Sequence, residues 1–404
     1  MWNGTAGKEG ESMVSLDEKL RSLKKELKSR KARIMIIGLG SVGNYLLDYL
    51  MSMGDEGMEI CVAGRNAQKM QSDVNIVRVS SMIRGQNRSG VRVMGGVDLN
   101  DIHAIAEAVS DFKPDIIVNS SRAYPGLKYG SISWKNVRAY GIWTPLSIKY
   151  TKNIMQAYER AGSYAVVINT SYSDAVIPWL KSAGEAYPDF GSGNINHLIP
   201  RFRFAIAQMR GIEDCWNIDI TFATGHFHDV VISKEGQTEG LDMLMDVRYK
   251  GQKLDIDVGE AAALCGIPMP VDAKRNMMNA SSNYEIIKTV LACVRDKKKG
   301  KLHCPGAFGE MGGYPVILDG TGEEPCGYIC ETYFTLDEMR RKNRESLYLD
   351  GIEDIRDGVL FYTDELIGKV KEAFGVELMK SVAYDEIADA ADFLIKEIIK
   401  KNMR

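Results

Sequence analysis

The chain has 404 residues, which is enough for two domains of ordinary size. Its 45% hydrophobic and 26% charged residues are typical of a globular protein with a large core. A formal net charge of −3 argues against a nucleic-acid-binding surface, and no apolar run is long enough for a membrane span or a signal sequence. The seven scattered cysteines form no CxxC pair, which indicates free thiols and predicts a cytoplasmic protein.

The first predicted element is an amphipathic helix that follows a polar N-terminal tail, and together they occupy residues 1–30. Leu16, Leu20, Leu23 and Leu27 recur at helical spacing, with acidic residues before basic ones. This leucine stripe predicts a packing surface, either within one chain or between subunits.

Residues 31–192 alternate between strand-like and helix-like segments. Strand-like runs occur in ARIMIIGLG, MEICVAG, VRVMGG, PDIIVNSS and YAVVINTS. Helical spacing occurs in SVGNYLLDYLMSM, in DLNDIHAIAEAVSDF, which we expect Asp98 to open, and around residues 145–162. Strands that alternate with helices form βαβ units, so we predict an α/β domain with a doubly wound parallel sheet.

Residues 193–404 contain both kinds of pattern without regular alternation. Strand-like runs occur in CWNIDITFATG, GYPVILDG and CGYICETYFTL, and long helices are expected near 270–297 and from about Glu353 to the end. This half is predicted to be an α+β domain that packs on the first.

A glycine loop follows the first predicted strand and opens a helix. IIGLGSVG places three glycines at G-x-G-x-x-G spacing, which permits a tight turn, close approach of a pyrophosphate and close helix–strand packing. The phosphates would bind free amides at the positive end of the helix. We therefore predict a Rossmann domain with these cofactor-binding residues: Gly38, Gly40, Ser41, Val42 and Gly43, with Ser120 and Asn169 at later strand ends. For Asn169 a capping role is an equal alternative.

The acidic residue that would hold the ribose hydroxyls of NAD is absent after the second strand. CVAGRN places Gly64, Arg65 and Asn66 there instead. A carboxylate would repel the 2′-phosphate of NADP, whereas an arginine binds it. We therefore predict NADP as cofactor, with Arg65 and Asn66 in its site. The alternative is that the site takes NAD and Arg65 is a surface residue.

The order of the later motifs resembles the lactate/malate dehydrogenase superfamily, from about residue 33 into the C-terminal third. NSSRAYPGLKYG resembles the family's mobile loop, and YAVVINTSYSDAVIP its strand ending in Asn. FGSGNINHLIPRFRFAIA resembles the helix that carries Arg-Phe-Arg, FATGHFHDVV the segment with the catalytic His, and GAFGEMGGYPVILDGTGEE the late hairpin. The resemblance implies a lactate/malate dehydrogenase-like catalytic domain that moves hydride between a nicotinamide and a 2-hydroxy or 2-keto acid.

The resemblance also implies roles for individual residues. Reduction of a 2-keto acid requires a carboxylate clamp, a polarising cation and a proton donor. Arg201, the first arginine of RFR, matches the clamp, and Arg122 matches the cation on the lid. Ser281 and Ser282 lie near the position that lines the pocket. The predicted substrate-binding residues are Lys128, Asn196, His197 and Ser282.

The sequence departs from the family in the proton relay. Leu198 occupies the position of the Asp that usually orients the catalytic His. The His segment is also out of register, so that either His226 or His228 matches the proton donor. Without an Asp partner, the pKa of that ring is expected to be lower than in an Asp-paired site. Three polar neighbours are predicted to orient the ring: Asn196, His197 and Asp229.

Other readings of the histidines remain open. His226 and His228 would share one face of a strand, and His197 or Cys215 would complete a metal site like that of the NAD-dependent glycosidases. Both histidines could instead be structural. We predict no bound metal.

Two other functions compete with the dehydrogenase. One is a reductase of the saccharopine or opine type, which resembles mainly the nucleotide domain. The other is a cofactor-binding sensor that has lost its chemistry. The leucine stripe and the family resemblance further predict a homodimer or homotetramer.

Overall fold

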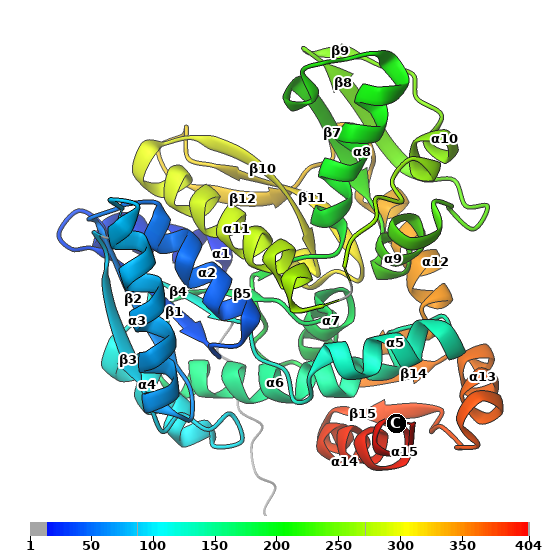
Figure 1. Cartoon of the computed structure of the whole chain (residues 1–404), viewed down its shortest axis with the longest axis horizontal. Coiled ribbons are helices and arrows are strands. Elements are labelled where there is room, and N and C mark those ends of the chain that lie inside the picture. Colours follow the sequence, from blue (N-terminus) through cyan, green and yellow to red (C-terminus); the bar gives the residue numbers. More distant parts are fainter. Residues whose placement is uncertain (1–13, 87, 271, 403–404) are drawn as a thin grey trace, which may run out of the picture.

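A six-stranded parallel sheet organises the first half of the chain in the computed structural model, which describes residues 14–86, 88–270 and 272–402 (Figure 1, left). The tail up to residue 13 lies outside these ranges. The spatial order of the strands is β3-β2-β1-β4-β5-β6, the Rossmann order, which reverses between β1 and β4. The strands are β1 (Ala32–Ile37), β2 (Met58–Ala63), β3 (Gly90–Met94), β4 (Ile116–Asn119), β5 (Val166–Asn169) and β6 (Phe190–Gly191).

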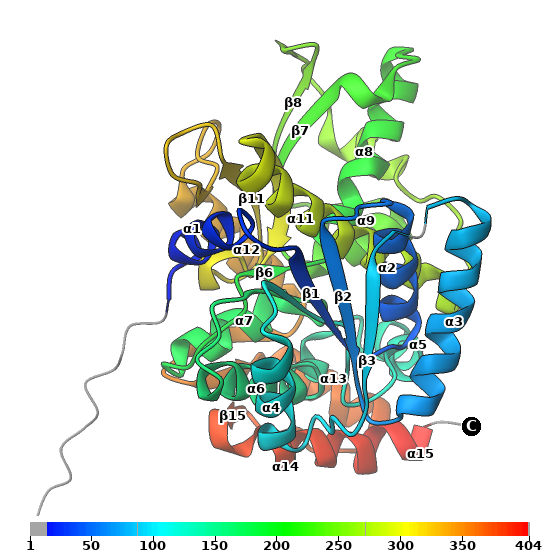
Figure 2. The same cartoon turned by 90° about the vertical axis from the view of Figure 1, so that its left-hand side faces the viewer.

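Helices cover both faces of this sheet, as Figure 2 shows for α2 and α3 on one side and α4 and α6 on the other. Residues of β1 alternate accordingly, because Ile34 and Ile36 belong to one buried cluster and Met35 and Ile37 to another. The helices are α2 (Ser41–Ser52), α3 (Ala67–Ile83), α4 (Ile102–Phe112), α5 (Gly126–Asn136), α6 (Thr144–Arg160) and α7 (Ser173–Ser182). The predicted doubly wound fold is confirmed.

The start of α4 differs from the prediction. Asp101, not Asp98, caps this helix, because its carboxylate accepts hydrogen bonds from the amides of His103 and Ala104. Asp98 instead accepts from the amide of Asn100 in the preceding turn.

The second half contains small antiparallel sheets with helices between them. Its elements up to residue 349 are α8 (Ile195–Arg210), β7 (Ile218–Ala223), α9 (His226–Glu235), β8 (Leu244–Tyr249), β9 (Gln252–Lys253), α10 (Val258–Ala263), α11 (Asn276–Asp296), β10 (Lys299–Pro305), β11 (Gly313–Asp319), β12 (Cys326–Ile329) and α12 (Leu336–Leu349). The predicted α+β architecture of this half is confirmed.

The long C-terminal helix expected from Glu353 is wrong. A three-stranded antiparallel sheet forms first, because Asp357 and Gly358 both adopt positive φ and turn the chain after β13. The final helices then pack under α6, at the bottom of Figure 1. The elements are β13 (Ile352–Arg356), β14 (Val359–Tyr362), α13 (Asp364–Phe374), β15 (Ser381–Ala383), α14 (Ile387–Phe393), a π-helical segment (Leu394–Ile399) and α15 (Lys400–Asn402).

Helix α1 (Leu16–Glu26) packs inside the chain against α11 and β12. Leu16, Leu20 and Leu23 are buried there, so this part of the stripe is used within one chain and is not available for a subunit contact. Lys19 is fully buried and forms an ion pair of 2.8 Å with Asp189. Oligomeric assembly stays a prediction.

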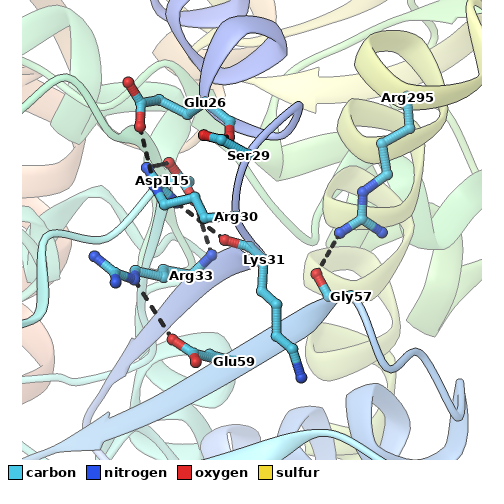
Figure 3. Close-up of polar contacts among 9 residues, drawn as sticks. All are labelled: Glu26, Ser29, Arg30, Lys31, Arg33, Gly57, Glu59, Asp115 and Arg295. Atoms are coloured by element: carbon cyan, nitrogen blue, oxygen red, sulfur yellow. Dashed lines mark hydrogen bonds and ion pairs between the residues drawn. The ribbon is translucent and has the colours of Figure 1, made fainter.

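A second set of ion pairs joins the end of α1 to the sheet (Figure 3). The guanidinium of Arg30 binds both carboxylate oxygens of Asp115 at 2.7 Å, just before β4. The amide of Arg33 donates to the same carboxylate. Such a bidentate pair fixes the chain where it enters β1.

No helix in the described part of the chain is long and apolar enough to cross a membrane.

Candidate functional site

A cavity of about 920 Å³ runs from the glycine loop to the start of α9, along the carboxyl ends of β1, β2 and β4. This edge, where the strand order reverses, is the usual ligand site of a doubly wound sheet. Eleven of the predicted site residues line the cavity: Gly38, Gly40, Ser41, Val42, Arg65, Asn66, Ser120, Arg122, His197, Arg201 and His226. Six others do not: Gly43, Lys128, Asn169, Asn196, His228 and Ser282.

The glycine loop has the shape that a dinucleotide requires. Gly38 has a φ of +88°, and a Cβ on Gly43 would lie 2.3 Å from the carbonyl oxygen of Gly38. A Cβ on Gly40 would instead meet nothing within 4 Å, so this backbone borders open space. No side chain caps the amides of α2. The loop therefore fits a pyrophosphate on the positive end of the helix.

The far end of the cavity carries two exposed cations, Arg65 and Lys69, between β2 and the first turn of α3. The residue after β2 is Gly64, and two acids also line this part of the cavity, Asp73 on α3 and Asp98 in the loop after β3. Its hydrogen bonds with Asn100 hold the pKa of Asp98 below its usual value. The Arg65 end of the cavity therefore carries two cations and two acids.

The two polar residues at the ends of β4 and β5 act within the protein. Ser120 lines the cavity, and its hydroxyl donates to the carbonyl of Gly38 at 2.6 Å, which fixes the loop. Asn169 is fully buried, and its carbonyl oxygen accepts from Asn119 and Thr151, both at 3.0 Å. Its amide is equally engaged. Asn169 thus holds the chain together between β5 and α7, and it neither lines the cavity nor caps a helix.

The stretch TGHFHDVV begins a helix and does not form the strand that the metal alternative assumed. Strand β7 ends at Ala223, and α9 starts at His226. Residues two apart on a helix are rotated by about 200° from each other. His226 lines the cavity, whereas His228 is buried against the hydroxyl of Ser346 (2.8 Å) and the carbonyl of Thr238 (3.2 Å). The shared strand face that the metal alternative required is therefore absent from this helix.

A carboxylate orients His226, although it comes from none of the predicted positions. Nδ1 of His226 lies 2.8 Å from an oxygen of Asp350, a fully buried residue directly after α12. The same carboxylate accepts the hydroxyl of Tyr172 (2.6 Å) and the amide of Tyr140 (2.7 Å). Asp350 thus corrects the expectation that Asn196, His197 or Asp229 holds the ring.

The surroundings of His226 favour its protonated form. Burial lowers the pKa of this imidazole, but the charge and hydrogen bond of Asp350, with Asp174 and Asp229 further away, raise it above its ordinary value. The expectation of a pKa below that of an Asp-paired site assumed that no Asp holds the ring, and Asp350 removes this premise. The edges of the Tyr140 and Tyr172 rings flank the imidazole, with ring centroids at 5.2 and 4.7 Å. Since Asp350 holds Nδ1, Nε2 is left for a ligand.

Charged groups gather around His226 at this end of the cavity. Arg201 is buried and donates to the carbonyl of Cys265 at 2.9 Å, and its Nε has no partner in the described chain. Asp229 follows His226 by one turn of α9. Burial raises its pKa to about 7. Lys234 and Arg275 also line this end of the cavity. They could not be predicted as site residues from the sequence, because neither belongs to a recognisable motif.

The remaining predicted residues lie outside the cavity. Lys128 is exposed on α5. The hydroxyl of Ser282 donates to Asn196 at 3.2 Å, and Asn196 donates to Glu285, so these residues join α8 to α11. Ser281 donates to a carbonyl within α11.

The chain just after the segment predicted as a mobile lid is tied to α9. Arg122 lines the cavity and is exposed. Further along, Trp134 donates to Glu235 at 2.9 Å, and Arg138 forms ion pairs with Glu235 and Glu239. Helix α5 is thereby held beside the His226 end of the cavity.

Solved structures with the same fold are dehydrogenases of small acids. Malate dehydrogenase from Aeropyrum pernix gives a TM-score of 0.50 at 16% identity, covering 78% of this chain and 97% of its own. Lactate dehydrogenase from Cryptosporidium parvum, in complex with lactic acid and nicotinamide adenine dinucleotide, gives 0.51 at 17%, covering 80% and 97%. Malate dehydrogenase from the same organism gives 0.52 at 14%, covering 79% and 98%. No family model and no curated protein matches the sequence. The chain therefore has the two-domain fold of malate and lactate dehydrogenases.

Substitution of two glycines of the loop separates folding from cofactor binding. Gly40→Ala should leave the melting temperature unchanged, because its Cβ meets no atom and its φ of −80° suits any residue. It should weaken dinucleotide binding, because the methyl group would enter the phosphate space. Gly43→Ala should lower the melting temperature, since its Cβ would clash with Gly38. Thermal unfolding and calorimetric titration with NADPH measure both effects, and unchanged affinity in Gly40→Ala would contradict the dinucleotide site.

Proposed function

We propose that the protein is a nicotinamide-dinucleotide-dependent oxidoreductase that interconverts a small 2-hydroxy acid and its 2-keto acid, with NADP as the preferred cofactor. One observation carries the proposal. A His–Asp pair, His226 and Asp350, borders the same cavity as a glycine loop that fits a dinucleotide. The fold, shared with dehydrogenases that act on malate and lactate, supports it.

The residues at each end of the cavity would divide the work. Gly38, Gly40 and the amides of α2 would hold the pyrophosphate, and Arg65 with Lys69 would hold the 2′-phosphate. When bound, the nicotinamide supplies or accepts the hydride at the carbinol carbon. The overall reaction converts 2-keto acid, NADPH and a proton into 2-hydroxy acid and NADP⁺.

His226 would handle the proton of this reaction. In the direction of reduction, protonated Nε2 donates to the carbonyl oxygen while hydride reaches the carbon. Asp350 keeps the ring in place and stabilises its positive charge through Nδ1. Arg201 and Arg275 provide guanidinium groups at the same end for the substrate carboxylate. In the direction of oxidation, neutral Nε2 takes the hydroxyl proton.

The two competing functions lose support from this geometry. The sensor was suggested by the missing carboxylate at Leu198, and Asp350 provides a carboxylate at the His226 ring. The contact between His226 and Asp350 does not specifically favour a saccharopine- or opine-type reductase, although such a reductase would also use a proton donor at this place. We therefore place the 2-hydroxy acid reaction first.

Substitution of the two histidines tests the proton donor. His226→Gln should slow single-turnover hydride transfer by about 100-fold or more, as expected for loss of a general acid. His228→Gln is the matched control and should keep near-normal transfer, because His228 faces Ser346 and Thr238 and not the cavity. NADPH affinity should be unchanged in both. Normal transfer in His226→Gln, tested against a panel of 2-keto acids, would exclude His226 as the donor.

The pH dependence tests Asp350. Its charge and hydrogen bond raise the pKa of His226, whereas burial lowers it. Asp350→Asn removes the raising effect, so the pKa of His226 should fall. The alkaline limit of the reduction rate should therefore move to lower pH, because the protonated ring is lost earlier. Asp337→Asn, on the exposed first turn of α12, is the control. If the pH profile of Asp350→Asn is not shifted, the reduction rate does not depend on the pairing of His226 with Asp350.

The cofactor preference depends on Arg65. Arg65→Ala should weaken NADPH binding by about 1–3 kcal/mol, the usual value of a charge-assisted contact, and leave NADH binding nearly unchanged. Titration of wild type and variant with both cofactors measures this difference. The assignment of NADP is wrong if wild type prefers NADH or if the variant loses both cofactors equally.

A further inference from the structure

Two hydrogen-bond acceptors at the His226 end of the cavity have no partner. Oδ1 of Asp229 and Nε2 of His197 are both shielded from solvent, and neither contacts a donor in the described chain. Both residues line the cavity. They share neighbours, because the charges of His226 and Arg201 act on each of them.

His197 is an acceptor because of its own environment. Burial, with the charges of Arg201, Arg275 and His226, lowers its pKa to about 4 despite a hydrogen bond with the backbone of Met278. The ring is therefore neutral at pH 7. Since Nε2 is the unpartnered nitrogen, Nδ1 carries the proton toward Met278, and the lone pair of Nε2 accepts no hydrogen bond from the described residues.

Asp229 remains unpaired although cations lie nearby. No ion pair joins it to Arg201 or to Arg275 among residues 14–86, 88–270 and 272–402 that the structure describes. Arg201 instead donates to Cys265 and to the sulfur of Met269. A shielded polar atom without a hydrogen bond is costly, so a ligand that provides a donor is the expected solution.

A simple 2-keto acid has no such donor, and the hydroxyl proton of a simple 2-hydroxy acid goes to Nε2 of His226 in the proposed reaction. The carboxylate and carbonyl oxygens of the 2-keto acid only accept hydrogen bonds, so they suit Arg201, Arg275 and protonated His226 but not Asp229 or His197. An ammonium group has three donors and no acceptor, and its charge complements a carboxylate. A neutral His197 does not repel it.

We infer that the substrate carries a protonated amine in addition to its carboxylate and its 2-hydroxy or 2-keto group, and that Asp229 and His197 bind this amine. The inference rests on the proposed function and narrows its substrate to amino-substituted hydroxy acids. The raised pKa of Asp229 agrees with it, because a bound cation would restore the ionised carboxylate that burial disfavours.

Matched pairs of small acids test this inference. The probes are lactate with 3-amino-2-hydroxypropanoate, and 2-hydroxybutanoate with 4-amino-2-hydroxybutanoate; each pair differs only by the amine. With NADP⁺, kcat/KM of wild type should be about tenfold or more higher for an amine than for its parent, the usual effect of a charge-assisted hydrogen bond. Asp229→Asn should remove this preference, which is measured as the ratio of kcat/KM between each amine and its parent acid, so that any change common to both acids cancels. Asp337→Asn is the control and should retain it.

The outcomes separate this inference from the proposed function. Equal rates for amines and parents in wild type would overturn the inference and leave the dehydrogenase intact. If glycerate reacts with the same kcat/KM as 3-amino-2-hydroxypropanoate, the assignment of an amine is overturned. If no probe reacts, the proposed function fails. Calorimetric titration of the same acids into the protein with NADP⁺ then tests the inference by itself. Amine-dependent binding that Asp229→Asn abolishes would support it, and binding without amine dependence would overturn it.

Discussion

The carboxylate of Asp350 is the contact on which the His226 end of the cavity depends. It accepts hydrogen bonds from His226, from the hydroxyl of Tyr172 and from the amide of Tyr140. Its backbone carbonyl accepts a further one from Gly141. A carboxylate with no exposure to solvent is stable only when several donors surround it. This single residue therefore joins α9, the start of α7 and the turn before α6.

The C-terminal sheet explains why Asp350 can be buried at all. Gly351, with a φ of +91°, turns the chain from α12 into β13, and the amide of Thr363 bonds back to it. Leu360 and Tyr362 of β14 are fully buried in the same cluster as Trp143 and Leu347. The segment after α12 thus packs under the six-stranded sheet and seals Asp350 from solvent. The position of the Asp350 carboxylate at one end of the cavity depends on this apolar packing.

Local patterns could be predicted from the sequence, and distant contacts could not. The glycine loop and the order of the first strands follow from residues close together in the chain, which fix φ, burial and helix starts. Asp350 lies 124 residues from His226, and nothing in the residues around it distinguishes it from a helix-end aspartate. The strand that the metal alternative assumed at His226 and His228 fails for a related reason. His226, Phe227 and His228 alternate like a strand, and only tertiary packing makes them the first turn of a helix.

The absence of a carboxylate at Leu198 and the presence of one at Asp350 are best understood together. Leu198, where the family resemblance leads one to expect an Asp, is fully buried in an apolar cluster with Phe202 and Phe222. A carboxylate at this place would need donors that its neighbours do not offer, and its burial would be costly. At Asp350 three donors are already present before any ligand binds. The ring of His226 needs only one carboxylate partner at Nδ1. Asp350, directly after α12, provides that partner, so that Leu198 on α8 is available for apolar packing.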